Sequence, residues 1–253
     1  MKHNALLAGL LAVAILALGL PAISAAAEGG WHTSGEIYLW MADANVTTTE
    51  GQEVEAEFDD VIDELELGFM GTLATRKDRW SWFGDLIFVA IDARETTPVS
   101  GPGIPGPIDA DLKFEQDVLV ITAGGGYSMS ESDSHRVDFA FGARYFDLET
   151  DIGVDLGVAG ALDVSDSSNV LDAFIGIKGY ADLSDRWYLG YYADVGAGDS
   201  DLAWQALVDF NYRFSKLDFG VGYRILEWQF DGKGLLDDFR ISGPYAGLVF
   251  NFD

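Results

Sequence analysis

Residues 202–225 read LAWQALVDFNYRFSKLDFGVGYRI, and their alternation decides the fold. From Trp204 to Phe214 every second residue is apolar, and most of the residues between are Gln, Asp, Asn or Arg. After Ser215 and Lys216 the same alternation resumes. A period of two residues is typical of a β-strand with one apolar and one polar face. The short break between the two runs therefore predicts a β-hairpin.

The apolar face of this hairpin is rich in aromatic residues, and the other face carries Asp, Asn, Arg and Gly. In a soluble β-sandwich the apolar face would point into the core. In a membrane barrel it points outward to lipid, and the polar face points into the lumen. The rest of the chain is needed to choose between these two arrangements.

The N-terminus has the pattern of a cleaved secretory signal peptide. Lys2 precedes an apolar run from Ala5 to Leu20, and the small residues 24–27 follow. A basic start, an apolar run of this length and an Ala-x-Ala-like end predict export. The run is short for a membrane-spanning helix, which needs about 20 residues. We therefore expect residues 1–27 to be a signal peptide and residues 28–253 to form the mature domain.

The mature chain is strongly acidic. Without Lys2 it has 14 Lys and Arg against 42 Asp and Glu, a net charge of −28. Phosphate binding requires a net basic surface, so this balance argues against nucleic acid as a partner. The chain has no cysteine, which rules out disulfides and thiol catalysis and is compatible with an oxidising compartment.

About ten strand-like segments span the mature chain, and the connections between them alternate in length. Short turns follow the second, fourth, sixth and eighth segments, at 77–79, 131–135, 184–185 and 215–216. Longer connections follow the first, third, fifth and ninth segments. Short turns on the periplasmic side and long loops outside are typical of outer-membrane barrels. A soluble sandwich gives no reason for this alternation.

We predict an all-β protein, a transmembrane antiparallel up-and-down barrel of about ten strands, with eight or twelve as alternatives. Residues 152–156 and 159–164 alternate inside the fifth-to-sixth connection. They either extend these strands beyond the membrane or form an extra hairpin in a twelve-stranded barrel. Phase slips at 226–227 and 242–244 predict β-bulges. Aromatic residues near the segment ends should form interfacial girdles; they are Trp40, Trp80, Trp82, Trp187, Trp204 and Trp228.

The last strand alternates Ala246, Leu248, Phe250 and Phe252 and is followed by Asp253. This ending resembles the C-terminal signal of Gram-negative outer-membrane β-barrel proteins, although those chains usually finish on the aromatic residue. The mature chain as a whole resembles the small porin-like members of that class. The resemblance implies a place in the outer membrane of a Gram-negative bacterium. It also implies contact with outer-membrane lipid and lipopolysaccharide, and recognition of the C-terminal strand by the barrel-assembly machinery. It leaves the oligomeric state open.

The alternation directs many charged side chains into the lumen, where they should pair because an unpaired buried charge is costly. The predicted network comprises Glu64, Glu66, Arg76, Asp85, Asp138, Arg144, Asp172, Lys178, Asp209, Arg213, Asp218 and Arg224. One interpretation is a closed structural barrel filled by salt bridges. The other is a narrow porin-like channel for small solutes or cations. Barrels of about eight strands are filled by side chains, so any pore through ten strands is small.

The mature chain offers little for catalysis. The outer-membrane enzymes that it resembles in strand number depend on a catalytic His as general base. Its two histidines, His32 and His135, fall before the first segment and in a predicted periplasmic turn. Neither position is at the outer rim, where omptin-like and deacylase sites lie. We therefore predict no catalytic residue, no cofactor and no enzymatic activity.

The acidic segment at residues 50–60 contains the hard oxygen ligands that Ca²⁺ prefers. Asp147, Glu149 and Asp151 also have the first spacing of a calcium loop, but Gly153 comes one position late and Val158 stands where the bidentate Glu should be. We therefore expect solvated acidic loops and no metal site. The alternative function is that of a surface-interaction or adhesion barrel that acts through these acidic extracellular loops, with or without Ca²⁺.

Overall fold

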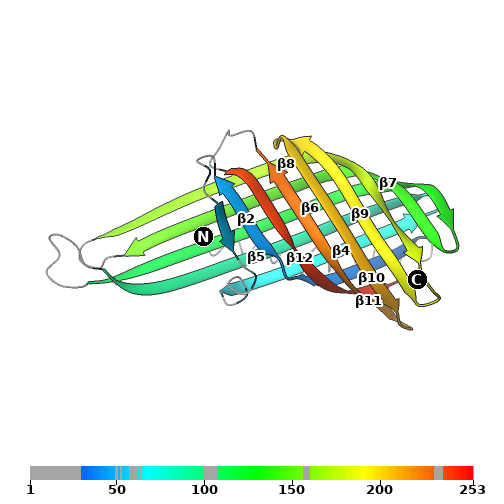
Figure 1. Ribbon diagram of the computed structural model, residues 1–253, viewed down its shortest axis with the longest axis horizontal. Coiled ribbons are helices and arrows are strands. Elements are labelled where there is room, and N and C mark those ends of the chain that lie inside the picture. Colours follow the sequence, from blue (N-terminus) through cyan, green and yellow to red (C-terminus); the bar gives the residue numbers. More distant parts are fainter. Residues whose placement is uncertain are drawn as a thin grey trace.

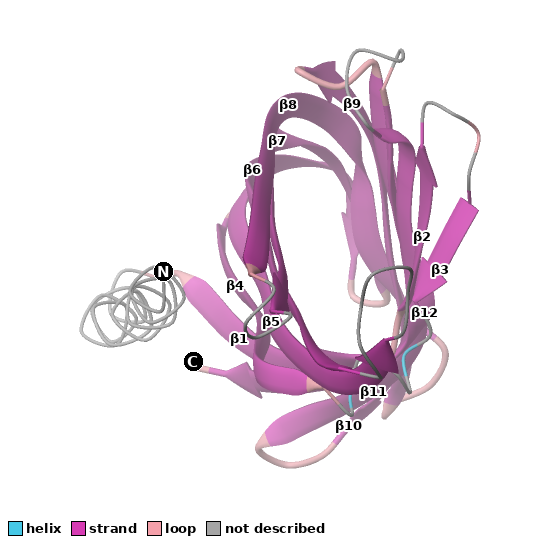
Figure 2. Ribbon diagram, turned by 90° about the vertical axis from the view of Figure 1, so that its left-hand side faces the viewer, coloured by secondary structure: helices cyan, strands magenta, loops and turns pink. Residues whose placement is uncertain are grey.

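The computed structural model describes residues 30–48, 51, 53–56, 58, 62, 64–99, 108–155, 160–230 and 236–252. Within these residues the strands form one antiparallel sheet that closes on itself (Figures 1 and 2). The strands are β1 (His32–Trp40), β2 (Asp43–Thr48), β3 (Glu53–Ala56), β4 (Leu65–Lys77), β5 (Trp80–Val99), β6 (Ile108–Ser132), β7 (His135–Asp155), β8 (Ala161–Asp182), β9 (Trp187–Gly198), β10 (Leu202–Arg213), β11 (Leu217–Gln229) and β12 (Leu236–Asn251). No helix in the described part of the chain has the length and hydrophobicity to cross a bilayer. The predicted signal peptide lies outside the described residues.

The ring closes where β1 pairs with both β12 and β4. β1 and β2 lie one after the other along the same edge of β12, with a break at Met41 and Ala42. β3 pairs only with β2 among the described strands. The closed wall of the described residues therefore has ten strand positions, as predicted.

The hairpin predicted at residues 202–225 is formed by β10 and β11, and its two strands pair over their whole length. The links β4–β5, β6–β7, β8–β9 and β10–β11 are short turns at one end of the barrel, as expected. At the first of these turns Asp78 adopts a positive φ of 53°. We call this end the short-turn end.

The barrel has an apolar outside and a polar inside. Alternate residues of β10, such as Val208 and Phe210, are exposed on the outer surface, whereas Gln205 and Asn211, which face the opposite side of the strand, are buried. The same arrangement recurs around the ring, with exposed Trp80, Trp82, Ile175, Trp187, Phe214, Phe219 and Leu248. Soluble proteins rarely expose a continuous apolar surface of this size. The distribution therefore excludes the soluble sandwich.

Four strands are much longer than the rest. β5 to β8 have 20 to 25 residues, whereas β9 to β11 have 12 or 13. Their far ends continue past the ring as a four-stranded sheet, which extends to the left in Figure 1. We call residues 92–99, 108–117, 149–155 and 161–169 the outer sheet. Residues 152–155 and 161–164 therefore extend β7 and β8 and do not form an extra hairpin in the wall.

Two predictions about strand ends are wrong. β11 pairs without a register shift on both sides, so the phase slip at Leu226 and Glu227 is not a bulge. Trp40 and Trp228 are buried inside the barrel and do not belong to a girdle. Both errors have one cause. Beyond the membrane boundary the outer face of a strand meets water and its inner face packs in the barrel interior, so polar residues change to the outer face and apolar residues to the inner face without a bulge.

Candidate functional site

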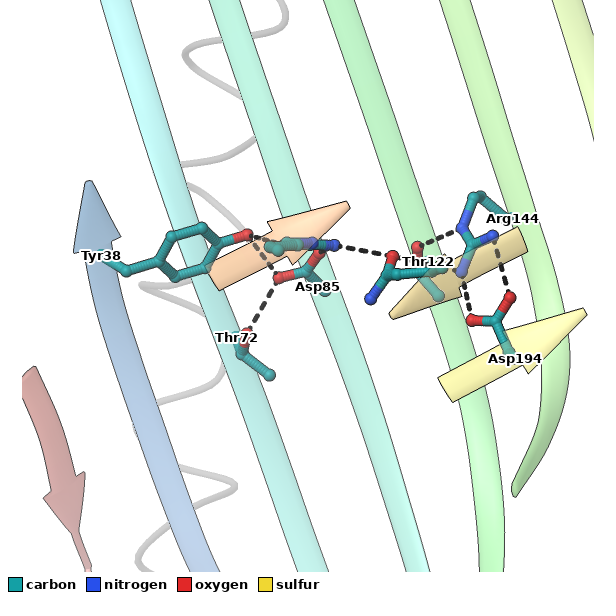
Figure 3. Close-up of polar contacts among 8 residues, drawn as sticks. Tyr38, Thr72, Asp85, Thr122, Arg144 and Asp194 are labelled. Carbon is teal, nitrogen blue, oxygen red and sulfur yellow. Dashed lines mark hydrogen bonds and ion pairs between the residues drawn. The ribbon is translucent and has the colours of Figure 1, made fainter. Parts of the chain in front are cut away.

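A belt of polar side chains crosses the lumen at mid-height (Figure 3). Arg224 on β11 forms an ion pair of 2.8 Å with Asp85 on β5, across the ring. The Tyr38 hydroxyl donates to Asp85 (2.7 Å) and accepts from Arg224 (2.7 Å). Thr72 donates to the same carboxylate at 2.9 Å. Every one of these groups finds a partner on another strand, which holds the walls of the barrel together.

A second ion pair continues the belt. Both terminal nitrogens of Arg144 on β7 bind the carboxylate of Asp194 on β9, one of them at 3.1 Å. The side-chain oxygen of Gln205 accepts from Arg144 at 3.3 Å and from Arg224 at 3.0 Å, so it joins the two pairs. Arg144 is 1% exposed, and bidentate pairing of this kind is the geometry that a buried Arg needs.

An apolar cluster fills part of the barrel interior on the long-strand side of the belt. The ring of Phe146 on β7 stacks on Trp228 of β11 with centroids 4.5 Å apart, and on Phe239 of β12 at 5.1 Å. β7 and β12 lie on opposite sides of the ring, so these contacts span the interior. We call this the plug; its buried members are Tyr38, Trp40, Ile87, Val120, Phe146, Val170, Ala203, Leu226, Trp228, Phe239 and Tyr245.

On the other side of the belt the lumen is hollow. A cavity of about 710 Å³ runs from Asp85 and Arg224 to His32, Arg213 and Asn251 at the short-turn end. Its walls carry both signs of charge. This polar vestibule and the plug together make a barrel that is hollow at one end and filled at the other.

Ten of the twelve predicted network residues lie inside the barrel. Arg76, Lys178, Asp209 and Arg213 are half-buried in the cavity wall, and the other six are buried. The buried ones are Asp85, Asp138, Arg144, Asp172, Asp218 and Arg224. Four of these six, Asp85, Asp138, Asp218 and Arg224, also line the cavity.

The structure corrects the two remaining residues. Glu64 and Glu66 are exposed at the long-strand end of β4 and do not line the cavity. The β4–β5 register shifts between Leu65 and Leu67, and this irregularity breaks the alternation on which the prediction rested.

Some of the pairing could not be predicted from alternation. Asp172 accepts from the backbone N–H and hydroxyl of Ser200, and Asp209 accepts from Tyr245, Asn211 and the N–H of Gly190. These acids are therefore satisfied by neutral donors. Arg136, which pairs with Asp138 at 2.7 Å, was missed although it has the same parity as Asp138.

The histidines lie at the short-turn end. His135 contacts the hydroxyls of Ser132 (2.7 Å) and Ser130 (3.0 Å) in or beside the β6–β7 turn; the two serines are exposed and His135 is half-buried. His32 lines the mouth of the vestibule. That the chain is not an enzyme stays a prediction. No group of three or more potential ligands in the described residues could hold a metal ion.

The outer sheet has two unlike faces. The face continuous with the barrel exterior carries Asp92, Glu115 and Asp151 in one cross-strand row, and Asp117 beside Glu149 in the next. The face continuous with the lumen carries apolar rows. One row is Ala93, Phe114, Ile152 and Val164, and the other is Glu95, Leu112, Val154 and Leu162. This sheet is thus acidic outside and apolar inside, the reverse of the wall below it.

The crowding of acids on the outer sheet has an electrostatic consequence. Burial raises the pKa of the Asp117 carboxyl above its usual value, and the nearby carboxylates of Glu149, Glu66, Glu115 and Asp151 raise it further. Glu149 lies directly opposite Asp117 in the ladder. Like charges opposite each other destabilise a sheet, so this row is retained at a cost in stability.

No protein-family model matches the chain, and no curated protein matches it in sequence. Solved structures with a similar course of the chain include the outer membrane protease OmpT from Escherichia coli, with 9% identity, coverage of 87% of this chain and 96% of that one, and a TM-score of 0.46. The translocator domain of the autotransporter NalP from Neisseria meningitidis has 14% identity, coverages of 94% and 96%, and a TM-score of 0.46. Ail of Yersinia pestis has 12% identity, coverage of 88% of this chain and 98% of that one, and a TM-score of 0.34.

The class of this protein follows from its own structure. A closed antiparallel ring has no unpaired edge within the bilayer, and an apolar exterior around a charged interior suits lipid outside and water or ion pairs inside. These features define a transmembrane β-barrel of the outer-membrane class, which confirms the fold predicted from the sequence. Short turns are typical of the periplasmic end of such barrels, and from this rule we infer that the outer sheet lies on the extracellular side.

Proposed function

We propose that this protein is a closed barrel of the Gram-negative outer membrane that acts through its outer sheet and does not conduct solutes. The observation that carries the proposal is the plug. The stacked rings of Phe146, Trp228 and Phe239 join opposite walls, and Trp228 is 0% exposed. A passive channel needs a continuous polar path, and an apolar constriction prevents the passage of ions.

The outer sheet supports an interaction role. The parts of β5 to β8 that continue beyond the ring do not help to close it. These four strands nevertheless stay paired side by side along this extension. We further propose that the apolar outer surface of the barrel contacts outer-membrane lipid and lipopolysaccharide, and that the assembly machinery recognises β12. The rigid ring then serves as a base for the outer sheet.

Single-channel recording tests the proposal. The refolded mature protein in a planar bilayer should show no conductance steps. Replacing both Phe146 and Trp228 with Ala removes the rings that cross the lumen and should produce steps. The matched control is Phe139→Ala, which removes an aromatic ring from the outer surface and should leave the barrel closed.

A narrow channel is the second candidate, and the vestibule of about 710 Å³ is the observation that favours it. Steady cation-selective steps in the wild-type protein, altered by Asp209→Asn in the vestibule, would replace the closed barrel with this alternative.

A further inference from the structure

The outer sheet has two edges, and they differ. β9 joins β8 only from Asp172 onward, so no described strand pairs with the outer edge of β8 at residues 161–169. On the other side, the ladder between β4 and β5 ends at Ile91 and the Asp92 N–H donates to Glu64, so no described strand pairs with the edge of β5 beyond Asp92. An open edge presents a row of backbone N–H and C=O groups that can pair with another strand.

The β5 edge is protected and the β8 edge is not. β5 includes Pro98, which has no N–H, and its residue in the outermost apolar row is the charged Glu95. Proline and inward charges are the devices by which proteins prevent edge pairing. Within its two apolar rows the β8 edge has neither Pro nor a charge, and these rows end in Leu162 and Val164, which are 64% and 53% exposed. The inward charge of this edge, Asp166, lies in the next row toward the ring.

We propose that the β8 edge binds an extended peptide segment of another protein as an added strand, and that this segment alternates apolar and basic residues. The proposal rests on the proposed function, because it names the partner of the outer sheet. An added strand would gain main-chain hydrogen bonds from the edge and specificity from its alternate side chains.

The ladder specifies the chemistry of the segment. Residues directly opposite each other in neighbouring strands share a face of the sheet. An apolar residue opposite Leu162 or Val164 would extend the two apolar rows by one strand. A basic residue opposite Asp163 would meet a carboxylate on the acidic face, because Asp163 alternates with Leu162 and Val164 along β8.

Charge complementarity selects this occupant over a second copy of the chain. Each chain has a formal net charge of −27, and pairing two β8 edges would bring their acids together without adding a base. A basic strand instead reduces the repulsion among the carboxylates of the outer sheet.

The binding test uses the full mature protein in detergent or nanodiscs and a synthetic peptide of about nine alternating Val and Lys residues. We expect binding that protects the amides of residues 161–169 from hydrogen exchange. A peptide of the same composition with Val and Lys in two blocks, and one that alternates Val and Glu, should bind about tenfold more weakly or not at all.

Two matched variants separate edge pairing from general attraction. Asp163→Lys and Glu115→Lys change the charge equally, but Asp163 is on β8 and Glu115 is on β6, in the middle of the sheet. We expect Asp163→Lys to weaken binding about tenfold and Glu115→Lys to weaken it less than about threefold. Equal weakening by both, or equal binding of the block peptide, would overturn the proposal.

Disulfide trapping gives a second readout that does not depend on affinity. Because the chain has no cysteine, Ser165→Cys on β8 and Thr96→Cys on β5 each introduce a single thiol. A peptide with one Cys should crosslink to the first and not to the second. Crosslinking only at Thr96→Cys would refute the β8 edge as the binding site. The proposal would also fail if residues 161–169 were protected by concentration-dependent dimerisation of the protein and not by the peptide. Conductance measured on the same sample distinguishes failure of this proposal from failure of the proposed function. A barrel that neither conducts nor binds the peptide refutes the edge site alone, and a wild-type protein that conducts refutes the proposed function.

Discussion

At the scale of single residues, the lumen depends on charges that meet across the ring. Arg224 and Asp85 come from strands that are 139 residues apart in sequence, and each has a further partner in Tyr38. Burial of two charges is tolerated when the geometry is good, but removing one partner leaves the other charge unpaired. The belt is therefore most sensitive to single substitutions.

We predict that Arg224→Leu destabilises the barrel by about 3–5 kcal/mol, because Asp85 then stays buried without its cation. Urea unfolding of the refolded protein, followed by tryptophan fluorescence, measures the change. The control is Arg94→Leu, which removes an exposed pair with Asp92 and should cost less than about 1 kcal/mol. The double variant Arg224→Leu with Asp85→Leu should recover part of the loss. Equal effects at positions 224 and 94 would contradict the role of the belt.

At the scale of strands, the polarity of one element reverses along its length. β7 presents Arg144 inward within the belt, Phe146 inward in the plug and Ile152 inward on the outer sheet, while Glu149 and Asp151 face outward. The hydrocarbon makes the outer face apolar only as far as the membrane extends. Above it, water allows acids outside, and the apolar residues collect on the inner face.

The acidic row of the outer sheet leads to a prediction about pH. The folded sheet holds the Asp117 proton more tightly than the unfolded chain, because its pKa is raised. The contribution of protonated Asp117 to the stability of the sheet is complete below the ordinary aspartate pKa of about 3.9. It is lost as the pH rises through the raised pKa of Asp117 in the folded protein. Asp117→Asn should thus stabilise the outer sheet at neutral pH, by roughly 0.5 kcal/mol, and have little effect near pH 3.

Hydrogen exchange of the β6 and β7 amides, corrected for the intrinsic rate at each pH, checks this expectation. Glu53→Gln on β3, outside the outer sheet, serves as the control. A stabilisation by Asp117→Asn that is the same at both pH values would show that the neighbouring carboxylates are not its cause.

Much of the candidate site could be predicted from strand parity, and its pairing could not. Parity correctly directs Arg144 and Arg224 inward, because a side chain's face depends only on its own strand. The partners of these residues depend on which strands face each other across the closed ring. Glu66 was misplaced because a register irregularity in β4 has no signature in the alternation.

At the scale of the whole molecule, the tryptophans report the inverted architecture. Trp80, Trp82 and Trp187 are exposed on the barrel exterior, whereas Trp40 and Trp228 are enclosed by it. In bilayers of brominated lipid we expect the first group to be quenched and the second to be protected. Replacing the three outer tryptophans with Phe should remove much of the quenching, and replacing the two inner ones should not. Strong quenching of a variant in which Trp228 is the only tryptophan would mean that the plug is open to lipid.

The sequence by itself determined that the chain forms paired amphipathic strands with short turns at one end, and which side chains face the lumen between the girdles. These properties follow from a local period of two residues and from the solvent on each side of the wall. Only the tertiary structure decided that Phe146, Trp228 and Phe239 stack inside the barrel, and that no described strand pairs with the edge of β8 at residues 161–169. Both features depend on how far each strand continues past its neighbours and on which strands face each other across the ring. The closure of the whole barrel sets these relations, and no local sequence pattern encodes them.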